Sequence, residues 1–158
     1  GGSRVTAGTG AEGLLQELLE RIARAAGVDA TVAIESQDDA LHAEYVGDDL
    51  GLLIGHHGQT IDAIQHLAFR ILARGEGHRT PVVVDAAGYR ERRAVSLRAT
   101  ADQAASVALS ERRAVALDAM SALERKVIHE YLKDRGDVET YSEGQEPSRH
   151  LVVAPLVD

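Results

Sequence analysis

Two glycines enclose two histidines in the segment Gly55-His56-His57-Gly58. Glycine has no Cβ atom, so this spacing allows the backbone to turn sharply between two helices. A sharp turn into a helix presents amide N–H groups at the helix N-terminus, where the helix macrodipole favours an anion. The segment could therefore bind a phosphate group through its backbone.

Apolar side chains flank this loop, with Leu52-Leu53-Ile54 before it and Ile61 after it. An apolar surface beside a phosphate-binding loop can hold unstacked bases, as in a KH domain that grips about four nucleotides of a single strand. The alternative is a tight helix-turn-helix without a ligand. The candidate nucleic-acid-binding residues here are Leu53, Ile54, Gly55, His56, His57, Gly58, Gln59, Thr60 and Ile61.

A second candidate site combines Arg125, Lys126 and His129. Arg125 and His129 are one helical turn apart, so a helix would place both on one face. A guanidinium can fork onto a phosphate, an ammonium adds a point charge, and an imidazole can stack on a base. Arg149 could join them if its strand lies beside that helix. Alternatively, Arg125 and His129 stabilise the domain through hydrogen bonds, and both roles can hold together.

The elements that must position these residues follow from the spacing of apolar side chains. Helical spacing predicts helices over residues 11–26, 60–73, 89–113 and 119–135, and a short helix before Gly55 that Asp48 or Asp49 caps. Alternating or short apolar runs predict strands over residues 30–36, 40–46, 81–85, 115–117, 138–141 and 151–153. We therefore expect an α+β protein made of two small two-layer α/β sandwiches, each a three-stranded sheet covered by helices.

The chain of 158 residues is long enough for two small domains. We expect a disordered tail or cloning remnant over residues 1–10, a first domain over 11–87, and a second domain with its long entry helix over 88–158. The lack of cysteine excludes disulfides and a thiolate zinc site. No apolar run approaches the roughly 18 residues of a membrane span, and no secretory signal is visible. A cytoplasmic location is expected.

The net charge of −8 argues against nonspecific nucleic-acid binding. The acidity is uneven, however, with ten acidic residues and three arginines in residues 1–50 but three of each in residues 51–87. Residues 88–113 contain six arginines and three acidic residues, so the loop lies in a neutral to basic part of the chain. Four arginines at the start of the long helix could follow a nucleic-acid backbone or form a solvated face: Arg90, Arg92, Arg93 and Arg98.

Metal binding and catalysis find little support. A metal site would need three or four ligands to converge, and the sequence has no H-E-x-x-H motif. It also lacks a nucleophile elbow, a P-loop and a defined pair of carboxylates. We expect no metal, no cofactor and no enzymatic activity. The histidines around the loop, near Asp62, are expected to be solvated: His56, His57, His66 and His78.

The first domain resembles the KH domain of the Jag family, also called the KhpB or SpoIIIJ-associated family. Its helix-strand-strand start matches the type II arrangement, and Val84-Asp85-x-x-Gly88-Tyr89-Arg90-Glu91-Arg92-Arg93 is similar to that family's exit from the KH domain. The family adds an R-3-H domain named after an Arg-x-x-x-His pair, which Arg125 and His129 supply. The segment Glu139–Arg149 is similar to the family's acidic loop and following arginine. The resemblance covers roughly residues 11–155.

This resemblance implies a bacterial single-stranded RNA-binding protein, acting in post-transcriptional control linked to cell elongation or division. It also implies a small single-KH-domain protein as a partner, and association with membrane or division proteins. The alternatives are a protein-interaction module that uses the KH fold as a scaffold, and single-stranded DNA binding. The acidic first third and the low aromatic content favour the interaction module, because single-strand binders often stack bases on aromatic rings.

The chain departs from the family at two places. His56 and His57 stand where the family usually has Lys or Arg in the loop. A neutral imidazole attracts phosphate less than a cation does, so we expect the loop to hold phosphate mainly through backbone amides. The segment before Arg125 also lacks the Pro and Asn common in the family, which leaves the start of that helix open.

Overall fold

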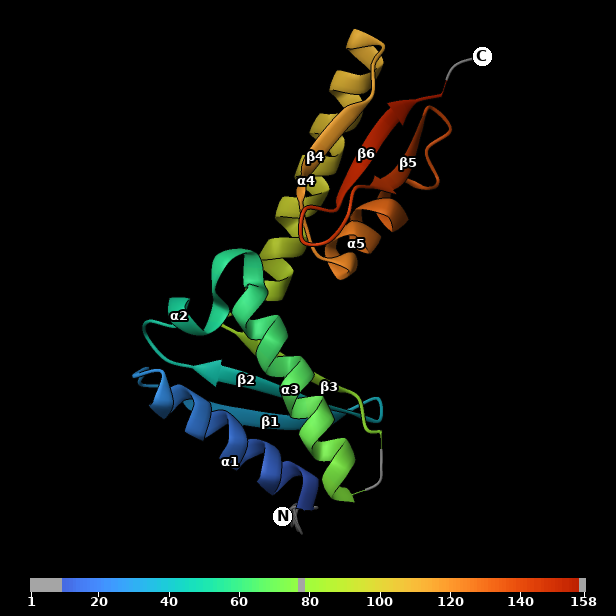
Figure 1. Ribbon diagram of the computed structural model, residues 1–158. Helices are drawn as coiled ribbons and strands as arrows, with labels where there is room; N and C mark the ends of the chain where they lie inside the picture. Colours follow the sequence, from blue (N-terminus) through green and yellow to red (C-terminus); the bar gives the residue numbers. More distant parts are fainter. Residues whose placement is uncertain (1–9, 77–78, 157–158) are drawn as a thin grey trace, which may run out of the picture. The chain divides into compact units, whose positions relative to one another are not determined.

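The computed structural model describes residues 10–76 and 79–156 (Figure 1). The chain divides into two compact units between Arg90 and Glu91. Residues 1–9 of the expected tail and His78 of the metal hypothesis lie outside the described residues. No helix in the described ranges is long and apolar enough to cross a membrane.

The first unit has the predicted order of helix, strand, strand, helix, tight loop, helix, strand. The elements are α1 (Gly10–Ala25), β1 (Thr31–Gln37), β2 (Ala40–Val46), α2 (Gly51–Ile54), the 3₁₀ turn η1 (His56–Gly58), α3 (Gln59–Glu76) and β3 (Val82–Ala86). Strand β2 pairs antiparallel with β1 and parallel with β3 in a three-stranded sheet of order β1-β2-β3. Helices α1 and α3 cover one face of this sheet (Figure 1).

Alternation along the strands builds the core of this unit. On β2, Leu41, Ala43 and Tyr45 are buried toward the helices, while Glu44 faces outward. The hydroxyl of Tyr45 donates a hydrogen bond of 2.7 Å to the carbonyl of Leu19, which ties α1 to the central strand. Burial raises the pKa of Tyr45 to about 12, so this donor stays protonated at neutral pH.

The second unit is a three-stranded antiparallel sheet with two helices packed against it. Its elements are α4 (Tyr89–Glu111), β4 (Val115–Ala119), α5 (Ala122–Leu132), β5 (Val138–Glu143) and β6 (His150–Pro155). The strand order is β4-β6-β5. The alanine-rich stripe of α4 packs in the same core as α5 and the central strand β6, as its small side chains predict. An α+β fold with two three-stranded sheets is thus confirmed.

Two local predictions were wrong. Helix α2 has Leu50 at its N-cap and no side-chain cap, so neither Asp48 nor Asp49 caps it. Helix α5 begins at Ala122 and not at Ala119, because Ala119 still pairs with His150 in the sheet. Ser121 supplies the cap, as its side chain accepts a hydrogen bond from the backbone amide of Glu124.

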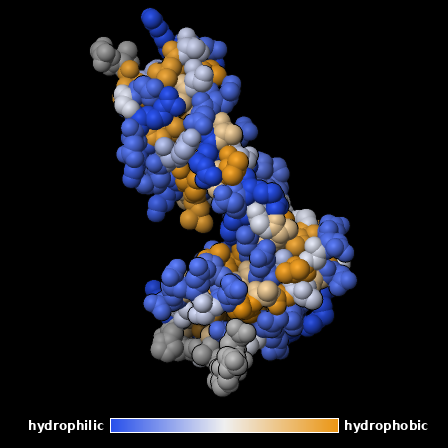
Figure 2. Space-filling view, turned by 180° about the vertical axis from the view of Figure 1, so that it is seen from behind, coloured by the Kyte–Doolittle hydropathy of each residue, from blue (hydrophilic) through white to orange (hydrophobic). Residues whose placement is uncertain are grey.

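Hydrophilic side chains predominate on the face shown in Figure 2, with apolar side chains exposed in patches. Two of the exposed apolar side chains lie next to the candidate sites: Leu52 beside the glycine loop and Tyr141 on β5.

Candidate nucleic-acid interface

The glycine loop has a backbone that few residues other than glycine can adopt. Gly55 has φ 74° and ψ −177°, a combination that is essentially restricted to glycine. Gly58 also has a positive φ, of 78°. His57 between them lies in the left-handed region, with φ 52° and ψ 29°. The sharp turn between α2 and α3 is therefore built from three departures from ordinary backbone, at Gly55, His57 and Gly58.

Both glycines are also required for space. A Cβ atom on Gly55 would lie 2.2 Å from Oγ1 of Thr60. A Cβ atom on Gly58 would lie 2.5 Å from Cε1 of the Tyr89 ring. The backbone at Gly55 thus lies close to Thr60 at the start of α3, and the backbone at Gly58 lies close to Tyr89 at the start of α4.

The two histidines project from the loop, and their backbone amides are not used by the loop's own hydrogen bonds. Both side chains are exposed, and their rings stack with centroids 3.8 Å apart. The described hydrogen bonds of the loop use the amides of Gly55, Gly58 and Gln59. Among these described bonds none uses the amide of His56 or His57, so both donors remain for a phosphate.

The structure changes the view of the apolar flanks. Leu53 and Ile61 are 1% and 0% exposed, so they support the loop from the core and offer no surface to a base. Ile54 is half-buried, whereas Leu52 is 64% exposed. The sequence analysis counted Leu52 among the flanking apolar residues but left it out of the candidate binding residues. The signal was present, since a four-residue helix with three consecutive apolar residues can bury only part of its circumference.

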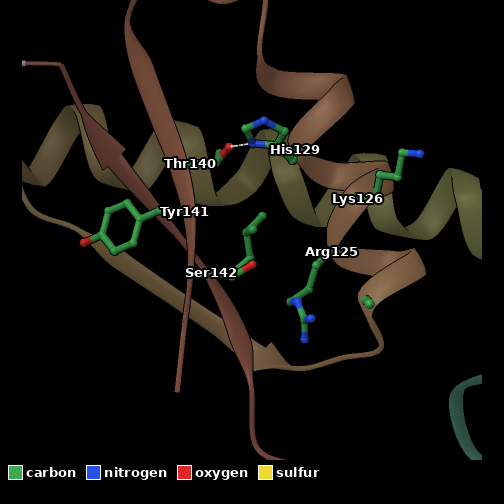
Figure 3. A pocket seen from close by; sticks show the side chains of 8 residues that line it. Arg125, Lys126, His129, Thr140, Tyr141 and Ser142 are labelled. Atoms are coloured by element: carbon green, nitrogen blue, oxygen red, sulfur yellow. Dashed lines mark hydrogen bonds between the residues drawn. The ribbon is translucent and has the colours of Figure 1, made fainter. Parts of the chain in front are cut away.

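A cavity of about 330 Å³ lies between α5 and β5 in the second unit (Figure 3). The predicted residues Arg125, Lys126 and His129 line it from α5. Thr140 and Ser142 on β5 add two hydroxyl groups that the sequence alone did not indicate. The remaining lining residues are Ala122, Tyr141 and Leu151.

Arg125 is the buried member of this site, with 8% of its surface exposed. Its Nη1 donates to the carbonyl of Met120 and to Oε1 of Glu146, each at 3.1 Å. Arg125 therefore stabilises the domain through hydrogen bonds, which is one of the two roles that the sequence left open. The described side-chain hydrogen bonds of Arg125 both use Nη1, so Nε and Nη2 remain as donors for a ligand.

His129 and Lys126 are both exposed but differ in their orientation. The Nδ1 atom of His129 forms a hydrogen bond with Oγ1 of Thr140, which fixes the ring at the edge of the cavity (Figure 3). Figure 3 shows Lys126 pointing away from the His129 ring. Lys126 can thus add charge near the cavity, while His129 is held in place for direct contact.

Arg149 does not join this group. It precedes the central strand β6, and its Nη1 donates to the carbonyl of Gly144 at 2.7 Å. It does not line the cavity with Arg125 and His129. Its predicted place in the site depended on a strand beside α5, whereas β5 is the strand that lies there.

Other charged groups serve the fold. Arg90 donates to Asp62, Gln65 and the carbonyl of Val84. Arg93 forms two hydrogen bonds with Glu124, which joins α4 to α5. These contacts favour a structural role for both arginines over contact with a nucleic-acid backbone. In the described part of the chain, no three His, Asp or Glu side chains are grouped so that they could hold a metal ion.

Comparison with known proteins yields a match in each unit. The family described as "KhpA/KhpB, KH domain" matches residues 12–84. The R-3-H domain family matches residues 95–155. These ranges contain the glycine loop and the cavity between α5 and β5, respectively.

Relatives named RNA-binding protein KhpB match across both units. The protein of Clostridium symbiosum is 34% identical over 140 residues, which cover 87% of this chain and 63% of the relative. The protein of Bacillus subtilis is 33% identical over 138 residues, covering 86% and 66%. That of Lactiplantibacillus plantarum is 43% identical over 104 residues, covering 66% and 32%. The chain thus spans about a third to two thirds of the length of these relatives.

The resemblance drawn from the glycine loop, the exit from the first domain and the Arg-x-x-x-His pair is confirmed. Both domain types are present in the expected order, and each matches the unit that contains its motif. The chain belongs to the KhpB (Jag) family, in which a KH domain is followed by an R-3-H domain.

Proposed function

We propose that the chain binds single-stranded RNA at two places, the Gly55–Gly58 loop and the cavity between α5 and β5. The observation that carries this proposal is the loop, whose glycines hold a turn at the start of α3 in which the described hydrogen bonds leave the amides of His56 and His57 unused. The printed names of the relatives support RNA as the ligand.

At the loop, phosphate oxygens accept hydrogen bonds from the amides of His56 and His57. The N-terminal turn of α3 adds its own amides and the positive end of its dipole. Leu52 and Ile54 provide apolar surface next to these donors, on which an unstacked base can lie. The backbone amides thus bind the phosphate, and the apolar side chains contact the bases.

At the cavity, Nε and Nη2 of Arg125 donate two hydrogen bonds to a phosphate. His129 contacts the adjoining base or sugar. Thr140 and Ser142 can hydrogen-bond to a ribose 2′-hydroxyl, the group that separates RNA from DNA. Because one chain carries both sites, the second contact forms at a high effective concentration once the first is made.

A non-catalytic role in post-transcriptional control of elongation or division follows from the family relationship as part of this proposal. So do a small single-KH-domain partner, contact with membrane or division proteins, and a cytoplasmic location. Titration of the full chain with a labelled single-stranded RNA, a DNA of the same sequence and a duplex RNA tests the ligand class. Preference for the single-stranded RNA is expected, and equal affinity for all three would contradict it.

A protein ligand is the second candidate, and one observation favours it. A cavity of about 300 Å³ next to α2 is lined by Asp29, Asp48, Asp49 and the exposed Leu52. This combination suits a basic and apolar segment of a partner protein. Binding to such a partner without any affinity for RNA would favour this function.

A further inference from the structure

The ring of Tyr89 forms one wall of the glycine loop. A Cβ atom built on Gly58 would lie 2.5 Å from Cε1, 2.8 Å from the hydroxyl oxygen and 2.9 Å from Cζ of this ring. The ring and the Gly58 backbone are therefore in direct van der Waals contact. Gly58 is buried, and the Tyr89 hydroxyl oxygen is also buried.

Hydrogen bonds of the neighbouring residues anchor the chain on both sides of Tyr89. It is the first residue of α4 and follows a turn in which Ala87 and Gly88 both have positive φ, of 51° and 65°. The carboxylate of Asp85 accepts hydrogen bonds from the amides of Ala86, at 2.8 Å, and Arg90, at 3.2 Å. The start of α4 is thereby fixed to the end of β3.

The side chain of Arg90 anchors the same turn to α3. It donates to Asp62 at 2.7 Å and to Gln65 at 3.0 Å, both on α3, and to the carbonyl of Val84 at 2.8 Å. The carbonyl oxygen of the Gln65 side chain also accepts from the amide of Val84 at 2.9 Å. Hydrogen bonds thus join β3, α3 and the first turn of α4 around Tyr89.

The loop has few hydrogen bonds of its own with which to hold its shape. Gly58 donates to the carbonyl of Gly55 at 3.3 Å, and Gln59 donates to His56. His57 and Gly58 both have positive φ, so the loop needs support from its surroundings to stay in this conformation. The ring of Tyr89 supplies that support at Gly58.

We propose that Tyr89 is a positioning residue for RNA binding, which holds the backbone of the Gly55–Gly58 loop in the conformation that presents its amides to phosphate. This inference rests on the proposed function, since it concerns how the loop binds RNA. The predicted first domain ends at residue 87. The inference extends the part of this domain that contributes to RNA binding to Tyr89 and Arg90.

The test compares Tyr89→Ala and Tyr89→Phe in the full chain. Tyr89→Ala is expected to weaken binding of a labelled single-stranded RNA by about tenfold, because residues that orient a binding group act on affinity at this scale. Tyr89→Phe keeps the ring and is expected to stay within about threefold of wild type. Tyr131→Ala is the matched control, because it removes a tyrosine that lies outside both sites, and it should leave affinity unchanged.

A readout without RNA separates positioning from loss of the fold. In Tyr89→Ala, hydrogen exchange of the Gly58 and Gln59 amides, which are hydrogen-bonded within the loop, should speed up, while exchange in β2 stays slow. Tyr89→Leu, which keeps apolar volume, should show the same change to a smaller degree and serves if Tyr89→Ala does not fold. Unchanged loop exchange in both variants would overturn the inference.

A double-mutant cycle tests the contact itself. Gly58→Ala places a methyl group against the ring, so it should weaken RNA binding less in the Tyr89→Ala background than in wild type. Additive effects would overturn the proposed contact. The His56→Asp/His57→Asp variant identifies a failure of the proposed function. If it binds RNA like wild type, the loop is not the RNA site. If it loses binding while Tyr89→Ala does not, the role of Tyr89 is overturned.

Discussion

The combined substitution His56→Asp and His57→Asp is expected to weaken RNA binding by about thirtyfold or more, because two carboxylates near a phosphate each cost about 1 kcal/mol even in water-like surroundings. The fold should survive. Both side chains are exposed, and aspartate is among the residues that tolerate the positive φ of 52° at His57. Anisotropy titration of the full chain measures the affinity, and circular dichroism checks the fold.

The matched control is His56→Asn/His57→Asn. Asparagine has nearly the size of aspartate and also accepts a positive φ, but it carries no charge. If the amides hold the phosphate, this variant should keep most of the wild-type affinity. An aspartate variant that binds like wild type would show that RNA does not contact the loop.

Replacement of Arg125 by alanine is expected to affect both stability and binding. The guanidinium is buried and hydrogen-bonded to the carbonyl of Met120 and to Glu146, so its loss leaves the Met120 carbonyl without this donor and costs about 2 kcal/mol. That corresponds to a fall of about 10 °C in the melting temperature of a domain of this size. RNA affinity should fall at least about tenfold, because a charged hydrogen bond to phosphate contributes about 1.5–3 kcal/mol.

Glu146→Gln separates these two effects. Glutamine can still accept the hydrogen bond from Arg125, but a negative charge next to the cavity is removed. We expect its melting temperature to change little and its RNA affinity to rise, since the Glu146 side chain is 62% exposed. An Arg125→Ala variant with wild-type stability and affinity would contradict the site described between α5 and β5.

The fold could be predicted from the sequence because apolar spacing reports local structure. The alternation of Leu41, Ala43 and Tyr45 marks β2, and the helical spacing around Leu15 and Leu19 marks α1. The start of α5 was misplaced because Ala119 belongs to a strand through its pairing with His150, a residue far along the chain. Apolar spacing cannot report such a partner.

The candidate sites could be predicted only in part, for the same reason. Gly55 and Gly58 stand out in the sequence, but the side chains that make glycine necessary there, Thr60 and Tyr89, do not. Arg125 and His129 stand out by their spacing. Their partners Glu146 and Thr140 come from other elements, and only the three-dimensional structure brings them together.

Salt dependence of RNA affinity is the most direct test of the central claim that this chain binds single-stranded RNA through phosphate contacts at two sites. The cationic side chains that this account places at phosphate are Arg125 and Lys126, so the logarithm of the association constant should fall with the logarithm of salt concentration with a slope of about −1.4. A variant that combines His56→Asp, His57→Asp, Arg125→Gln and Lys126→Gln should bind weakly and with a slope close to zero, because both of these cations are removed. A wild-type affinity that does not change with salt, or the same slope in both proteins, would contradict the account.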